Sequence, residues 1–165
     1  MTAHRACFYI DSGKFVESGV LRAVQWLEEL RQRDPTKTNA LVVVHQHRNL
    51  DGGITSALGA RLVNRLARYK WVILDSGIRV NLMTDRGGVL HWDGPAVLFW
   101  PVGEKRGERL LEQVESIMGG PQPKARGVTD LLVVMDVSKK VGWPNWLLSW
   151  IEKNGAAELT IDWPS

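Results

Sequence analysis

The sequence predicts an α/β domain of three layers, in which helices cover both faces of a mostly parallel β-sheet. Short apolar runs at residues 7–10, 40–44 and 71–74 have the length and composition of buried strands. Segments with apolar residues at helical spacing separate these runs. Successive strand–helix–strand units favour parallel strands joined by right-handed crossovers. Together these observations are typical of a Rossmann-like, doubly wound sheet.

The composition fits a single domain spanning residues 1–165. A chain of this length buries roughly 70% of the surface that its unfolded form exposes, and 44% hydrophobic with 24% charged residues is near the average for globular proteins. Cys7 is the single cysteine, which argues against a disulfide framework. No apolar run is long enough for a signal peptide or a membrane span, so we expect a cytoplasmic protein without a membrane partner.

The first half of the chain alternates strands and helices. Residues 14–33 predict an amphipathic helix that ends before Pro35, and residues 40–44 predict a strand covered on both faces. The next helix is expected at residues 54–69. Its predicted buried stripe is Ile54, Leu58, Leu62, Leu66 and Tyr69. Residues 71–74 predict the third strand, parallel to the first two.

The second half departs from this alternation. Residues of about 78–93 predict an inserted β-hairpin, because two β-like runs flank the turn signal at residues 85–88. A strand at 96–102, a helix at 107–120, a strand at 131–137 and a helix at 142–155 follow. Residues of about 119–128, rich in glycine and proline, predict a flexible loop. The terminal residues 157–163 alternate apolar and polar side chains, which suits an edge strand, and the predicted sheet allows one antiparallel edge strand.

Three aspartates follow predicted strands, and two of them begin the same Asp-Ser-Gly sequence. Asp11, Asp75 and Asp136 would lie at the carboxyl ends of the strands, where ligands bind in open parallel sheets. They are the candidate catalytic residues, because two such carboxylates can hold a divalent metal for phosphodiester cleavage. The alternative is that they form turns, in which aspartate is common.

A second candidate site precedes the helix at residues 54–69. Gly52 and Gly53 would leave backbone N–H groups open to an anion, with Arg48 and Thr55 completing a phosphate site. An ordinary glycine-rich turn is the alternative. Metal-ligand candidates lie in the same region: His45, His47 and Asp51.

Two surfaces are candidates for macromolecular partners. Arg61, Arg65 and Arg68 align on one helical face and could follow a nucleic-acid backbone, or simply form a solvated flank. The candidate partner-binding residues of the last helix are Trp146, Leu148 and Trp150, whose alternative place is the core.

The function expected from these patterns is binding of a phosphate-bearing ligand, a nucleotide or a nucleic-acid backbone, at the carboxyl ends of the strands. Two alternatives stay open: a non-catalytic assembly module that binds a protein partner or a second copy, and a metal-dependent phosphodiesterase or nuclease. The sequence leaves open whether the protein is an enzyme. Its cofactor is unknown, with a divalent metal as the candidate.

Overall fold

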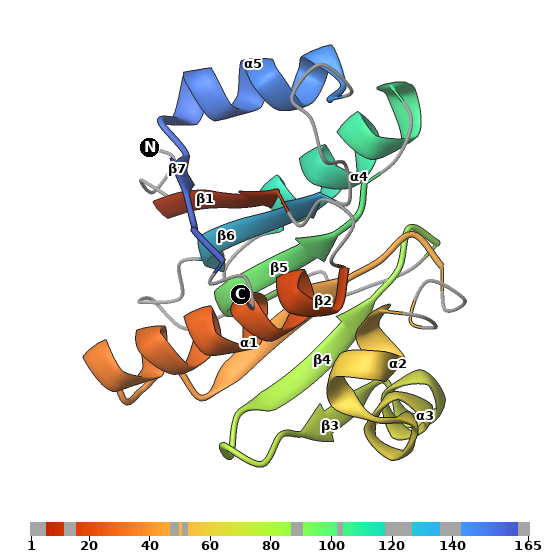
Figure 1. The fold of residues 1–165 in the computed structure, drawn as a ribbon. Coiled ribbons are helices and arrows are strands. Elements are labelled where there is room, and N and C mark those ends of the chain that lie inside the picture. Colours follow the sequence, from red (N-terminus) through yellow and green to blue (C-terminus); the bar gives the residue numbers. More distant parts are fainter. Residues whose placement is uncertain are drawn as a thin grey trace.

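A computed structural model describes residues 6–11, 16–46, 50, 53–86, 91–101, 104–117, 127–135 and 143–161, and every structural statement below concerns these residues. They form one sheet with helices on both faces (Figure 1), which confirms the predicted three-layer α/β fold. None of the described helices has the length and apolar content to cross a membrane.

The elements agree with most of the predicted ones. The strands are β1 (Ala6–Asp11), β2 (Asn39–Val43), β3 (Trp71–Ile73), β4 (Arg79–Met83), β5 (Asp93–Phe99), β6 (Gly127–Met135) and β7 (Ala157–Glu158). The helices are α1 (Val16–Arg33), α2 (Gly53–Leu58), α3 (Ala60–Tyr69), α4 (Glu104–Glu115) and α5 (Asn145–Asn154). Residues 127 and 128, at the end of the predicted loop, belong to β6.

The strand order across the sheet is β3-β4-β2-β5-β6-β1-β7 among the described residues. All neighbouring pairs are parallel except β3 and β4. The terminal strand β7 lies at one edge, as predicted, and pairs parallel to β1. The antiparallel edge strand that the fold class allowed is β3, at the other edge.

Side chains alternate between two apolar clusters, one on each face. Helices α1, α2 and α3 cover the first face, where Trp26 is 1% exposed and its ring lies 5.7 Å from that of Phe8. Helices α4 and α5 cover the second face, where the rings of Tyr9 and Trp143 meet edge to face at 5.5 Å. The central strands are buried on both faces, so their side chains are apolar on both sides, and this explains the continuous apolar runs in the sequence.

The prediction that the third strand is parallel is wrong. A short turn joins β3 to β4, in which the Leu74 amide donates to the Ile78 carbonyl (2.9 Å) and Gly77 has φ of 89°. The turn sends the chain straight back, so β4 runs beside β3 in the opposite direction. The predicted hairpin at 78–93 therefore contains an internal strand, since β4 also pairs parallel to β2. Residues 87–90, at its expected tip, lie outside the described residues.

The predicted helix at 54–69 is two helices, α2 and α3. Gly59 separates them. Its φ of 92° is a positive value that glycine adopts readily and that does not occur within a right-handed α-helix. Tyr69 was expected in the buried stripe, but it is 52% exposed. It occupies the last turn of α3, next to the left-handed Lys70 that caps the helix.

Candidate functional site

The carboxyl ends of β2 and β5 form a topological switch point, the position at which open α/β sheets bind ligands. These strands are neighbours, yet β2 leads to α2 on one face and β5 leads to α4 on the other. Ligands bind in open α/β sheets where neighbouring strands lead to opposite faces. Strand β4 ends beside β2, so residues that follow β4 also lie near this switch point.

Three charged or titratable side chains meet there. His45 follows β2, Asp85 follows β4, and Arg106 lies in the first turn of α4. The Oδ2 atom of Asp85 lies 3.5 Å from Nδ1 of His45 and 3.2 Å from a terminal guanidinium nitrogen of Arg106. Asp85 is thus shared between a buried imidazole and an exposed guanidinium.

The environment of His45 lowers the pKa of its imidazole. Burial lowers the pKa of His45, since only 5% of the residue is exposed and the charged form loses hydration. The hydrogen-bonding and charge of Asp85 act in the opposite direction, and the Arg106 charge adds to the lowering. Burial outweighs Asp85, so the net direction of the pKa shift is downward.

A polar cavity of about 250 Å³ lies beside these residues. Its lining is Asp85, Arg86, Arg106, Arg109, Leu110 and Gln113. Three of these side chains carry a guanidinium, and one carries a carboxylate. The exposed Arg86 and Arg109 bring positive charge to the cavity beyond what Asp85 neutralises.

The sequence predicted a turn at Asp85 and Arg86 and a helix at 107–120, and neither prediction pointed to a cavity between them. A signal was present in helix α4. Arg106, Arg109 and Gln113 are spaced by three and four residues, which places them on one helical face. The distance along the chain between Asp85 and this helix hid their proximity.

The predicted catalytic aspartates do not come together. Asp11 ends β1 at the carboxyl edge of the parallel strands. Asp75 follows β3, which runs antiparallel to β4, so it lies at the end of the sheet where the parallel strands begin. Four strands also separate β3 from β1. Asp136 lies outside the described residues.

The predicted glycine turn is described only in part. Gly53 begins α2, and the Thr55 hydroxyl donates a hydrogen bond to the Leu50 carbonyl at 2.9 Å, which engages it within the turn. Arg48 and Gly52, with the metal candidates His47 and Asp51, lie outside the described residues. In the part of the chain that is described, no group of three histidine, cysteine or acidic side chains could hold a metal ion.

The two predicted partner surfaces differ in exposure. Arg61, Arg65 and Arg68 are all exposed on α3. In α5, Trp146 and Trp150 are buried in the second-face cluster, at 7% and 6% exposed, whereas Leu148 is 40% exposed. The tryptophans therefore serve the core, as the alternative prediction held.

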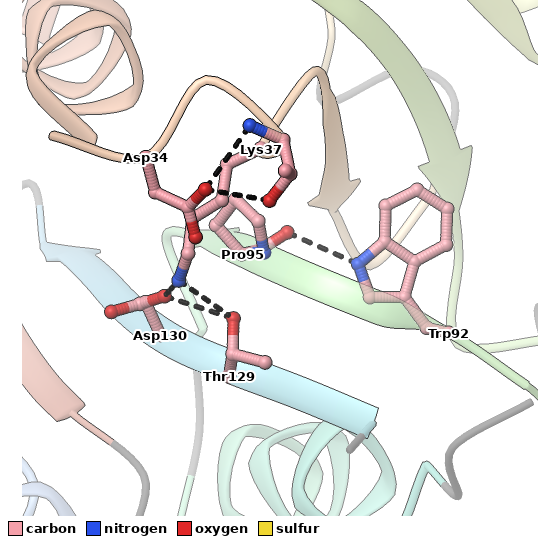
Figure 2. A network of polar contacts seen from close by, with 7 residues as sticks. Asp34, Lys37, Trp92, Pro95, Thr129 and Asp130 are labelled. Atoms are coloured by element: carbon pink, nitrogen blue, oxygen red, sulfur yellow. Dashed lines mark hydrogen bonds and ion pairs between the residues drawn. The ribbon is translucent and has the colours of Figure 1, made fainter. Parts of the chain in front are cut away.

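A second polar network lies at the opposite, amino end of the sheet (Figure 2). Lys37 forms an ion pair with Asp130 of β6 and donates a hydrogen bond to the Thr129 hydroxyl at 3.3 Å. The Trp92 indole donates to the Pro95 carbonyl at 3.2 Å. The contacts of Lys37 tie the loop between α1 and β2 to β6, and the Trp92 hydrogen bond lies at the start of β5.

Comparisons with protein-family models, curated proteins and solved structures gave no match to this chain.

Proposed function

We propose that the protein binds a phosphate-bearing ligand in the polar cavity between α4 and the residues that follow the carboxyl end of β4. One observation carries the proposal: among the described residues, three guanidiniums and one carboxylate line a cavity of about 250 Å³. Asp85 neutralises one positive charge, and the remaining excess favours an anion. Arginine matches phosphate well, because its planar guanidinium donates two parallel hydrogen bonds to phosphate oxygens.

The contacts of Arg106 support this role. An isolated exposed arginine samples many rotamers, and ordering it on binding costs free energy. Asp85 restrains Arg106 at 3.2 Å before any ligand arrives. Such an exposed ion pair stabilises the fold little. Its value would lie in holding the guanidinium at the cavity.

The size of the cavity suggests which part of a ligand it takes. Pockets that enclose a drug-sized molecule measure about 300–1,000 Å³, and this cavity is smaller. It suits a phosphate group and its immediate neighbours, with the rest of the ligand outside. A nucleotide or another phosphomonoester fits that description.

Thermal-shift measurements test the proposal. Inorganic phosphate, AMP and ATP should raise the Tm, since a ligand that binds the native state stabilises it, whereas adenosine should not. Arg109→Ala should abolish the shift. Lys153→Ala removes an equal charge from the exposed last turn of α5 and should keep it. Equal shifts with adenosine and AMP, or no shift with any phosphate compound, would contradict the proposal.

A further inference from the structure

A row of alternating guanidiniums and aromatic rings runs along the β3 edge of the sheet. Arg79 of β4 lies 4.5 Å from the ring centroid of Trp71, and Arg65 of α3 lies 5.4 Å from the same centroid. Arg65 also lies 5.7 Å from the Tyr69 ring, which Arg68 approaches to 5.3 Å. The order is Arg79, Trp71, Arg65, Tyr69, Arg68, and we call these five residues the edge row.

Most of the edge row is open to solvent, although Trp71 is half-buried. Its three arginines are exposed, and Tyr69 is 52% exposed. Ile73, two residues after Trp71 and on the same face of β3, is 54% exposed. Helices α4 and α5 pack over the central strands of that face, and Met83 is the one residue of the described β3 and β4 in their cluster. Among the described residues, neither α4 nor α5 covers this side of the sheet edge.

The charge around the edge row is strongly positive. Residues 60–79 contain five basic side chains and one acidic side chain, Asp75. This short segment has a net charge of +4, whereas the whole chain has +3. The basic side chains of this segment lie in α3, directly after it and at the start of β4, and none of them lines the cavity.

We propose that the edge row binds single-stranded nucleic acid. A guanidinium stacked on a ring keeps its N–H groups free in its own plane, where they can donate to phosphate oxygens. Tyr69, which is 52% exposed, and the outer faces of the exposed guanidiniums can stack on bases between those phosphate contacts. A duplex meets the same charges but keeps its bases stacked on each other, so it gains nothing from the rings. Single strands are therefore preferred.

Fluorescence anisotropy with a labelled oligothymidylate tests this inference; a length of about 12 nucleotides is within the range that one small domain covers. Binding should weaken roughly 5- to 150-fold in Tyr69→Leu, because stacking on a base is lost. Arg65→Ala should weaken binding and reduce the slope of log K against log salt by about 0.7 for each phosphate contact removed. Lys153→Ala should match the parent protein.

Two further measurements isolate stacking from charge. Arg65→Lys retains the charge but not the planar group, so it should bind more weakly than the parent while the salt slope is kept. If Tyr69→Leu lowers the Tm, the comparison of Arg65→Lys with the parent protein tests the inference in its place. Arg109→Ala should leave oligothymidylate binding intact, which separates this surface from the proposed cavity. Equal affinity for duplex and single strand, equal binding by Arg65→Lys and the parent, or preference for a poly-glutamate peptide would overturn the inference.

Discussion

The imidazole of His45 and the carboxylate of Asp85 are in contact across the ends of two neighbouring strands, with Nδ1 and Oδ2 3.5 Å apart. Their backbones are also joined, since the Asp85 amide donates to the His45 carbonyl at 3.2 Å. This double connection fixes where Asp85 stands above the sheet. Because Asp85 also pairs with Arg106, it sets one wall of the cavity.

The stability of the protein should fall in mild acid because of His45. Burial lowers the pKa of His45 in the folded protein, so the unfolded chain binds a proton more readily. The stability that neutral His45 contributes is complete above its unfolded pKa of about 6.5 and is lost as the pH falls toward the folded value. His45→Gln should therefore show a smaller decrease in Tm than the parent between about pH 7 and pH 5. Parallel Tm profiles would contradict this.

Asp85 and Arg106 should shift the pKa of His45 in opposite directions. Asp85 raises that pKa and Arg106 lowers it. Asp85→Asn should consequently lower the pKa of His45 further, and Arg106→Ala should raise it. Proton NMR titration of the imidazole measures both changes. Shifts of the same sign in the two variants would show that the three side chains do not interact as the distances indicate.

Lys37 and Asp130 form the ion pair at the amino end of the sheet, and their contributions to the free energy of unfolding should be coupled. Lys37→Met leaves the carboxylate of Asp130, 11% exposed, without its counter-ion (Figure 2), which should lower the free energy of unfolding by about 1–3 kcal/mol. Urea denaturation measures the loss. Adding Asp130→Asn to Lys37→Met should recover part of it, because no unpaired charge remains. Fully additive losses would argue against the pair.

Gly77→Ala should destabilise the β3–β4 turn for two separable reasons. The φ of 89° strains alanine by about 1 kcal/mol. In addition, the new Cβ would stand 3.0 Å from the guanidinium of Arg31, which donates to the Ser76 carbonyl. In an Arg31→Ala background the same change should cost less, as the second reason disappears. Thermal unfolding of the four proteins gives the coupling, and an equal cost in both backgrounds would exclude a role for Arg31.

The local sequence pattern predicted the helices and strands whose side chains form the core. The apolar runs of β1, β2 and β6 and the amphipathic α1 were visible because burial on one or both faces leaves a period in the sequence. The direction of β3 was not visible. Its three residues read like any buried strand, and only the turn at Gly77 and pairing with β4 determine that it runs antiparallel.

The site shows the same division. His45 was predicted only as a metal-ligand candidate with His47 and Asp51, and the arginines of α3 were predicted as a surface because they align on one helical face. Asp85 could not be assigned to His45, since their contact depends on β4 lying next to β2. Asp11 and Asp75 lie apart for the converse reason. The same Asp-Ser-Gly sequence begins at the end of β1 and directly after β3, but β3 runs in the opposite direction, so the two aspartates lie at opposite ends of the strands.

Amide NMR titration with inorganic phosphate and with ATP tests the central claim most directly, because it locates the ligand on the protein. The proposal predicts saturable shifts for Asp85, Arg86, Arg106 and Arg109, with the same residues responding to both compounds. Arg109→Ala should remove the shifts at the remaining cavity residues. Shifts that concentrate on other strands or helices, or no saturable shift at the four cavity residues, would contradict a phosphate site at the carboxyl ends of the strands.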